Sequence, residues 1–372
     1  MSRCSPRIPM TTFRSSLSKL TGSYKVIDEI NQTVQSASGC REDLVWGRAD
    51  ILEVRLPSDV VQSLGDAEIS ADPRRVLVGL VGRGIQLSRT PAMHEAEGDA
   101  QGLAYIYRLL DTDRMGDAAP GLVDILAFAE HFGFDGLNVT FPYKQEIIPL
   151  LDGLSEAAEA LGSVNTVVLR DGRRVGHNTD MSGFRESFRH GMAGAPREKV
   201  LLLGAGGAGA AVAHALLDDG AGQVMISDVE PRRAAALAAR LGSRFGAGRV
   251  TVVSDLAAAA ASADGLVNAS PVGMTKLPGL PLDPALLRPE CWVADIVYFP
   301  LETELLAQAR SRGCRTLSGE GMAVHQAARA FQLFTGIAPD VDRMKSAFAA
   351  FNGAPAVGGV TVGLHPVRIF EN

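Results

Sequence analysis

Long hydrophobic runs and surplus positive charge are both missing from this sequence. No stretch approaches the roughly 20 apolar residues that a membrane-spanning helix needs, because Gly, Asp or Arg interrupts each candidate. The 36 Lys and Arg residues are outnumbered by 42 Asp and Glu, which gives a formal net charge of −6. A phosphate backbone is held largely by surplus Lys and Arg. We therefore expect neither a nucleic acid nor a membrane as a partner.

Cysteine is scarce, and the four that occur are Cys4, Cys40, Cys291 and Cys314. None of them forms the closely spaced pair that a disulfide framework or a zinc site requires. We interpret them as reduced thiols of a cytoplasmic protein. The seven histidines show no metal-ligand spacing, so no metal is predicted.

What the chain does contain is enough apolar sequence for a packed protein of two domains. It has 372 residues, of which 46% are hydrophobic and 21% are charged, and a domain takes roughly 100–200 residues. Residues 1–75 show weak periodicity, and their first third is basic and rich in Ser and Thr. We interpret 1–75 as an N-terminal extension that is disordered, or that begins at a start codon placed too far upstream; a transit peptide is a further alternative. Residues 351–372 form a Gly/Pro/Val-rich tail.

Short apolar strands alternate with helical patterns from Val76 onwards. Asp171-Gly172 is a hairpin signal, so the last two strands of this first unit are expected to pair antiparallel in a mixed sheet. We expect strands at 76–81, 104–109, 135–139, 164–169 and 173–177, and helices at 91–101, 121–132, 143–149 and 154–160.

A second unit alternates strands and helices at the spacing of a parallel, doubly wound sheet of the Rossmann type. Beyond Leu317 the sequence pattern predicts helices, most clearly over 322–334. In this unit strands are expected at 199–203, 223–227, 250–253, 265–269 and 292–297, and helices at 210–217 and 231–241.

A glycine-rich motif follows the first strand of this second unit. The run from Gly204 to Gly209 matches G-x-G-x-x-G, which is a weak signal alone but a stronger one between a strand and a helix. The motif predicts a dinucleotide site in which the pyrophosphate lies at the helix N-terminus. The candidate residues are Gly204, Gly206, Gly207, Ala208 and Gly209.

The acidic residue after the next strand indicates which dinucleotide is bound. A carboxylate at Asp228 accepts hydrogen bonds from ribose hydroxyls and repels a 2′-phosphate, so it favours NAD over NADP. Arg232 and Arg233 could instead bind a phosphate, but Glu230 adds a second negative charge beside them. We keep Arg233 as a cofactor-binding candidate and predict NAD, with NADP as the less favoured cofactor.

Polar side chains gather at three strand ends, in segments 88–91, 138–144, and 164–166 with 178–180. Their hydroxyls, amides, lysine and carboxylate suit a ligand with several hydroxyl groups, each of which needs a donor and an acceptor. Helix capping and turn formation are the alternative explanation for any one of them.

Several motifs together make the chain resemble the shikimate/quinate dehydrogenase family from about Leu80 to Asp340. They are Gly-Leu-Asn-Val-Thr-Phe-Pro-Tyr-Lys, Ser-Val-Asn-Thr, Asn-Thr-Asp-x-x-Gly-Phe, Gly-Ala-Gly-Gly-Ala-Gly, Asn-Ala-Ser-Pro-Val-Gly-Met and Gly-Met-Ala-Val-His-Gln-Ala, in this order. The resemblance implies a two-domain α/β enzyme. A substrate-binding domain (76–179 plus 319–350) would contain an inserted Rossmann-type domain (180–318).

The same resemblance implies a role for individual residues. Lys144 and Asp180 would be the catalytic pair, and Tyr298 would lie beside substrate and nicotinamide. Ser88 and Thr90 would bind the substrate carboxylate. The ring hydroxyls would be bound by Thr140, Asn165 and Gln326. The cofactor would be bound by Asn268, Ser270 and Gly319. Oxidising an alcohol requires a base within about 2.6–3.2 Å of the hydroxyl. We hypothesise that Asp180 orients Lys144 and this hydroxyl while Lys144 passes the proton.

Two departures from the usual family pattern bear on the reaction. Thr90 stands where biosynthetic shikimate dehydrogenases usually have Ser, and Asp228-Val-Glu230 replaces the Asn-Arg-Thr of NADP-dependent members. Both favour an NAD-dependent quinate/shikimate dehydrogenase acting on a small molecule, as a monomer or homodimer. An NADP-dependent biosynthetic shikimate dehydrogenase, an aminoshikimate dehydrogenase and a non-catalytic NAD-binding regulator remain as alternatives.

Overall fold

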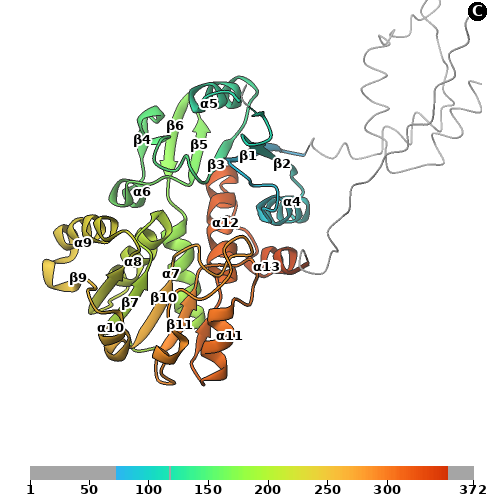
Figure 1. Ribbon diagram of the computed structural model, residues 1–372. Helices are drawn as coiled ribbons and strands as arrows, with labels where there is room; N and C mark the ends of the chain where they lie inside the picture. The colour runs from blue at the N-terminus through green and yellow to red at the C-terminus, as the bar shows by residue number, and fades with distance from the viewer. Residues whose placement is uncertain (1–72, 117–118, 351–372) are drawn as a thin grey trace, which may run out of the picture. The chain divides into compact units, whose positions relative to one another are not determined.

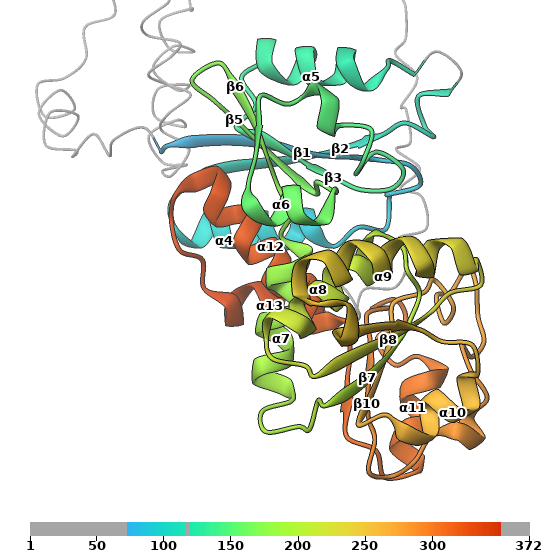
Figure 2. The same cartoon turned by 90° about the vertical axis from the view of Figure 1, so that its left-hand side faces the viewer.

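The computed structural model describes residues 73–116 and 119–350. These residues form two six-stranded sheets with helices packed against both faces of each (Figures 1 and 2). The predicted extension, except for residues 73–75, and the predicted tail lie outside the described residues. No helix in the described part of the chain is long and apolar enough to cross a membrane.

The first sheet is mixed, as the sequence predicts. Its strands run in the order β2-β1-β3-β5-β6-β4. β1 pairs parallel with β2 and β3, whereas β5 pairs antiparallel with β3 and β6. The β5–β6 turn has positive φ at both Asp171 (53°) and Gly172 (68°), as a type I′ hairpin requires. The strands are β1 (Arg75–Gly82), β2 (Ala104–Asp111), β3 (Gly136–Val139), β4 (Gly153–Leu154), β5 (Thr166–Arg170) and β6 (Arg173–His177).

Helices from both ends of the described chain cover this sheet. α4 (Thr90–Ala100), α12 (Glu320–Thr335) and α13 (Val341–Ala350) share one apolar core with β1 and β2. α5 (Leu122–His131) and α6 (Glu156–Leu161) contribute to the core on the opposite face, and Figure 2 shows α5 and α4 on opposite sides of the sheet.

The predicted helix over 143–149 is wrong. This segment forms turns, and only Ile148–Leu150 makes a short 3₁₀-helix, η2. Pro149 has no N–H group, so the i→i−4 hydrogen bonds of an α-helix cannot continue through it. Lys144 therefore lies in an irregular turn whose backbone is held by specific bonds, including one of 2.8 Å from the Val164 N–H to the Lys144 carbonyl.

The second sheet is parallel throughout and runs in the order β12-β11-β10-β7-β8-β9. This is the strand order of a dinucleotide-binding Rossmann sheet, in which ligands bind beyond the carboxyl ends of the central strands. Its strands are β7 (Lys199–Leu203), β8 (Gln223–Ser227), β9 (Val250–Val252), β10 (Gly265–Asn268), β11 (Trp292–Asp295) and β12 (Thr316–Leu317). The helices are α8 (Gly207–Asp218), α9 (Pro231–Phe245), α10 (Leu256–Ser262) and α11 (Glu304–Ser311), with 3₁₀ turns η3 (Ala247–Arg249) and η4 (Pro284–Leu286).

A helix that the sequence analysis does not foresee joins the two sheets. α7 (Asp180–Gly191) packs against α12 of the first sheet and α8 of the second. A Cβ atom on Gly183 would lie 2.8 Å from the Met322 carbonyl oxygen and 2.9 Å from the Gln326 nitrogen, so only glycine permits this close approach. The domain division at residues 180 and 319 stays a prediction.

Replacing Gly183 with Ala is expected to lower the free energy of unfolding by about 1–2 kcal/mol, because overpacking against backbone atoms costs more than the helix propensity gained. Urea unfolding followed by circular dichroism measures this change. Gly242→Ala in α9 is the matched control, since its new Cβ would be 3.5 Å from the Cα of Ala247, an ordinary van der Waals contact. Equal stability of the two variants would contradict the close approach of α7 to α12.

Candidate active site

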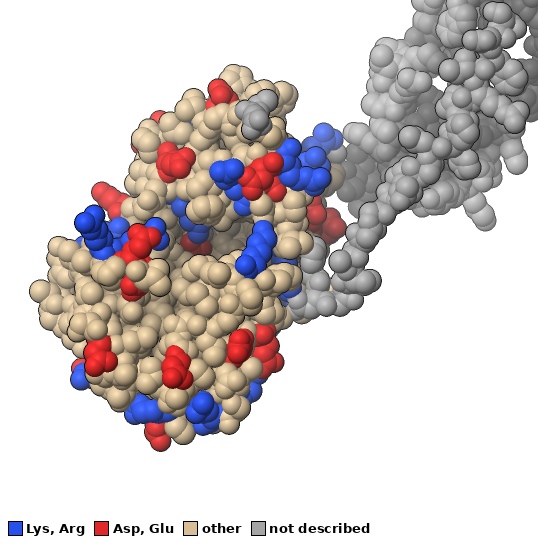
Figure 3. All heavy atoms as spheres, viewed as in Figure 1, with Lys and Arg blue, Asp and Glu red and all other residues tan. Residues whose placement is uncertain are grey.

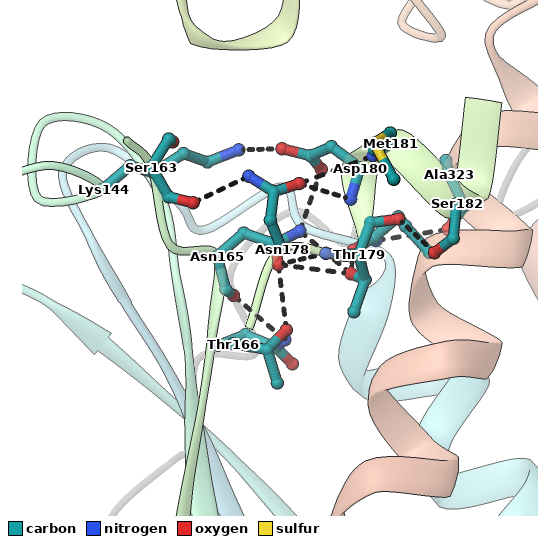
Figure 4. A network of polar contacts seen from close by, with 12 residues as sticks. Lys144, Ser163, Asn165, Thr166, Asn178, Thr179, Asp180, Met181, Ser182 and Ala323 are labelled. Carbon is teal, nitrogen blue, oxygen red and sulfur yellow. Dashed lines mark hydrogen bonds and ion pairs between the residues drawn. The ribbon is translucent and has the colours of Figure 1, made fainter. Parts of the chain in front are cut away.

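The polar residues of the first sheet meet where its central strands end. Lys144 lies in the turn after β3, and Asp180 is the first residue of α7, shortly after β6. The register pairs Asn138 with Thr166 and Thr166 with His177. Because β5 is antiparallel to both β3 and β6, the segments that follow Asn138 and His177 lie beside the segment that precedes Thr166, and residues far apart in the sequence become neighbours (Figure 4).

Lys144 and Asp180 are in direct contact. The Lys144 Nζ donates to Asp180 Oδ2 at 2.6 Å, and the two side chains are 26% and 11% exposed. The other carboxylate oxygen, Oδ1, accepts a hydrogen bond of 2.9 Å from the amide of Asn165. The pair is thus sheltered but still reachable from solvent, and both carboxylate oxygens are held (Figure 4).

Two asparagine side chains fix the start of α7. Asn178 Oδ1 accepts the N–H groups of Asp180 at 3.1 Å and of Met181 at 3.4 Å. The amide of Asn165 donates to Thr179 Oγ1 and Asp180 Oδ1, while its oxygen accepts the Thr179 N–H at 2.8 Å. Asp180 is therefore held at a helix N-terminus, where the helix macrodipole stabilises a carboxylate.

A buried polar chain supports Asn165 from behind, and the sequence analysis missed its first member, Tyr107. Tyr107 donates to Asn138 Oδ1 at 2.8 Å, Asn138 donates to Thr166 Oγ1 at 3.0 Å, and Thr166 donates to Asn165 Oδ1 at 3.1 Å. A buried asparagine needs such partners. The presence of Asn138 inside an apolar strand was the available signal, but it did not identify Tyr107.

Gln326 and Tyr298 lie near the pair. Thr179 Oγ1 donates to Gln326 Oε1 at 3.4 Å. Tyr298 keeps 40% of its surface exposed, yet desolvation of its hydroxyl, with the negative charge of Asp180, raises the pKa of Tyr298. Both residues therefore lie close to Asp180 or to its neighbour Thr179, and their roles in substrate binding stay predictions.

Ser88, Thr90 and Thr140 are half-buried and less tightly tied to the pair. The hydroxyls of Ser88 and Thr90 are 3.3 Å apart at the start of α4. The Thr140 carbonyl accepts the Tyr143 N–H at 2.9 Å and so begins the turn that carries Lys144. Within the described residues, no hydrogen bond joins these three hydroxyls to Lys144 or Asp180. Figure 3 shows a hollow in the surface that both basic and acidic side chains reach.

The glycine-rich turn after β7 has the shape that a pyrophosphate needs. Gly204 has φ of +103°, and a Cβ on Gly209 would lie 2.0 Å from the Gly204 carbonyl oxygen. A Cβ on Gly206 would meet nothing within 4 Å, so space is open above the start of α8. The first N–H groups of this helix, from Gly207 to Gly209, have no acceptor within the helix and are suited to an anion.

Asp228 lies directly after β8, and backbone N–H groups hold both of its carboxylate oxygens. Asp228 accepts the Ala205 N–H at 2.7 Å and the Glu230 N–H at 2.8 Å, one on each carboxylate oxygen. Each oxygen keeps a further lone pair for a ribose hydroxyl. Arg233 forms an exposed ion pair of 2.8 Å with Glu230, which competes with a phosphate for its guanidinium. Arg232 forms no ion pair with another described residue.

A third group of residues shapes the turn after β10. Asn268 donates to the Val272 carbonyl and to Asp295 Oδ1, and its oxygen accepts from the N–H and hydroxyl of Ser270. Asn268 is fully buried, so its side chain organises the turn rather than facing a ligand. Gly319 packs tightly, since a Cβ atom added to it would lie 2.3 Å from the Ile296 carbonyl oxygen.

Asp295 is a buried carboxylate that the sequence analysis missed. It accepts hydrogen bonds from Thr303 Oγ1 at 2.7 Å, the Val297 N–H at 3.0 Å and Asn268 at 3.0 Å. Burial raises its pKa to about 6, although these three hydrogen bonds oppose the shift. Asp295 links the Asn268 turn to the segment that carries Tyr298.

Among the described residues, no cluster of three or more His, Cys, Asp or Glu side chains is arranged to hold a metal ion.

Comparison with known proteins identifies the family. Residues 80–167 match the family model described as the shikimate dehydrogenase substrate binding domain, and residues 319–347 match the shikimate 5'-dehydrogenase C-terminal domain. The chain is 54% identical to a shikimate dehydrogenase (NADP(+)) of Streptomyces avermitilis, over 76% of this chain and 97% of the relative. The chain belongs to the shikimate dehydrogenase family.

Other relatives share this similarity but differ in cofactor. A quinate/shikimate dehydrogenase (NAD(+)) of Corynebacterium efficiens is 50% identical over 73% of this chain and 97% of that protein. The structure of quinate dehydrogenase from Corynebacterium glutamicum in complex with NAD superposes with a TM-score of 0.71 at 48% identity, covering 74% of this chain and 99% of that one. This shikimate dehydrogenase family member is therefore a shikimate/quinate dehydrogenase, and the resemblance found in the sequence is confirmed.

The stability of this shikimate dehydrogenase family member should depend on Asp295. Its folded-state pKa of about 6 lies above the usual 3.8, so the folded protein binds the extra proton between these pH values. The contribution of Asp295 to the free energy of unfolding is therefore fully present below about pH 4, and roughly 3 kcal/mol of it is lost as the pH rises through 6. Urea unfolding at several pH values should show that the free energy of unfolding falls less steeply with pH in Asp295→Asn than in the wild type.

The exposed residue Asp283 provides the control for this comparison. Asp283→Asn should retain the wild-type dependence of stability on pH. An Asp295→Asn protein whose unfolding free energy follows the wild-type curve from pH 4 to 7 would show that this carboxylate is not the titrating group.

Proposed function

We propose that this protein oxidises quinate and shikimate to their 3-dehydro products with NAD as the electron acceptor. The observation that carries the proposal is the 2.6 Å contact between Lys144 and Asp180, held in place by Asn165. A positioned amine and carboxylate beside several neutral hydroxyl and amide groups suit proton transfer from an alcohol.

In the proposed mechanism, the reacting hydroxyl lies against the Lys144–Asp180 pair. Asp180 orients the hydroxyl and the Lys144 amine, and Lys144 accepts the proton and passes it to solvent. NAD, when bound, supplies the acceptor for the hydride that leaves carbon. As the proton leaves the hydroxyl, Lys144 becomes an ammonium, and this new positive charge, held in place by Asp180, stabilises the negative charge that develops on the substrate oxygen.

The remaining polar residues are proposed to orient the substrate. Ser88 and Thr90 bind the carboxylate, while Thr140 and Gln326 bind ring hydroxyls and Tyr298 closes the site. Asn165 already uses its amide hydrogens on Thr179 and Asp180. A direct bond from Asn165 to the substrate therefore requires it to release one of these partners.

Preference for NAD rests on the end of β8. Asp228 presents free lone pairs there, Val229 is 97% exposed, and Glu230 engages Arg233. The backbone N–H groups of Gly207, Ala208 and Gly209 would hold the pyrophosphate, and the turn from Asn268 to Ser270 with Gly319 would line the nicotinamide side. Arg232 is the residue that favours the NADP alternative.

Initial rates with quinate and shikimate, each with NAD and NADP, test the proposal. We expect the higher kcat/KM with NAD on both substrates. Activity confined to shikimate with NADP would indicate the biosynthetic enzyme instead. NAD binding without turnover of either substrate would indicate a regulator or an amino-substituted substrate.

Replacing Lys144 with Ala is expected to lower kcat by roughly 10²- to 10⁴-fold, the usual contribution of a general acid–base group. Because Lys144 contributes little to the other substrate contacts, shikimate binding should weaken only a few-fold, as calorimetry can measure. Lys345→Ala, an exposed change on α13, is the control and should leave kcat unchanged. Near-normal turnover by Lys144→Ala would remove it from the mechanism.

Replacing Asp228 with Asn should shift cofactor preference. Loss of the negative charge removes the repulsion of a 2′-phosphate, so the ratio of kcat/KM for NADP to that for NAD should rise about tenfold or more. Asp171→Asn, in the distant β5–β6 turn, removes the same charge as a control and should leave the ratio unchanged. An unaltered ratio in Asp228→Asn would assign cofactor choice to other residues.

A further inference from the structure

Arg89 lies between Ser88 and Thr90 and has no role in the mechanism above. Its side chain is turned inward and is only 3% exposed, which is unusual for an arginine. The hydroxyls on either side of it are the proposed ligands of the substrate carboxylate. What surrounds its guanidinium therefore bears on how an anion binds at this loop.

Two aromatic rings and one carbonyl surround this guanidinium. Its central carbon is 4.7 Å from the centre of the Phe348 ring and 5.4 Å from that of Phe299. One terminal nitrogen donates to the Phe348 carbonyl oxygen at 3.3 Å. Arg89 thereby connects the loop before α4 with α13 and with the segment after β11.

Among the described residues, Arg89 forms no ion pair with Asp or Glu. Desolvation lowers the pKa of Arg89, while electrostatic interactions with Tyr298 and Glu320 oppose that shift. An arginine remains protonated in proteins, and a buried charge without a partner is unfavourable.

The neighbourhood of Arg89 favours an anion in two further ways. Thr90 begins α4, an 11-residue helix whose N-terminus carries partial positive charge. Tyr298 is within electrostatic range of both Arg89 and Asp180, and the Arg89 guanidinium packs over Phe299, the next residue in the chain. A negative group bound at Ser88 and Thr90 would supply the missing counter-charge.

We propose that Arg89 is the buried cation that attracts and orients the substrate carboxylate held by the Ser88 and Thr90 hydroxyls. This inference rests on the proposed function and extends it by assigning the electrostatic part of substrate recognition to one residue. It also gives a reason for a charged side chain at a position where an apolar one would pack against Phe299 and Phe348 without a desolvation cost.

The test compares shikimate with shikimate methyl ester, which keeps the ring and carbonyl but lacks the negative charge. Arg89→Met retains an unbranched side chain against the two rings without charge, and Arg89→Lys retains charge. We expect Arg89→Met to lower kcat/KM for shikimate roughly 10- to 100-fold, which corresponds to about 1.4–2.8 kcal/mol of lost transition-state stabilisation. The same variant should lower kcat/KM for the ester less than threefold. Arg89→Lys should preserve most of the preference for the acid.

The ratio of the two kcat/KM values is measured on one preparation, so partial misfolding of a variant does not affect it. Arg108→Met removes an exposed charge from β2 and should leave the ratio at its wild-type value. Equal losses on acid and ester in Arg89→Met, or no loss on either, would overturn the role of the charge. A wild-type protein that oxidises neither compound would overturn the proposed function itself, and this inference with it.

Discussion

The contact between Lys144 and Asp180 is the interaction on which the rest of the site depends. Neither residue is placed by a regular element alone, because Lys144 lies in an irregular turn and Asp180 at the first position of a helix. Both positions are made definite by asparagine side chains and backbone bonds. A charged pair held from several sides loses little freedom when a substrate arrives, which is the condition for efficient proton transfer.

Neutral polar groups do most of this holding. The chain from Tyr107 through Asn138 and Thr166 to Asn165 is buried, and each member has a partner. Such a network adds directional constraints without adding charge near Asp180. The first sheet thus carries a polar interior at its functional end and an apolar core elsewhere.

Two buried charged side chains contact the segment 297–299 that follows β11. Asp295 organises the turn after β10 and has hydrogen-bond donors for both of its oxygens. Arg89 lies beside the proposed carboxylate loop and lacks a carboxylate partner among the described residues. Asp295, whose oxygens accept hydrogen bonds from the surrounding residues, stabilises the fold. Arg89, which has no carboxylate beside it among the described residues, is suited to binding an anion.

Apolar periodicity and the limited backbone choices at Gly204 and Asp171-Gly172 were enough to predict the two α/β units, the parallel sheet of the second and the glycine-rich turn. Sequence patterns also placed Lys144 and Asp180 in polar strand-end segments. The packing of α7 on α12, the support of Asn165 by Tyr107 and the burial of Asp295 and Arg89 became visible in the folded chain alone. These features depend on contacts between residues far apart in the chain, and local pattern carries no information about which distant side chain supplies a partner. The helix expected at 143–149 failed partly for a local reason, because Pro149 cannot continue the helical hydrogen bonds, and partly for a long-range one, because the Lys144 carbonyl accepts the N–H of Val164.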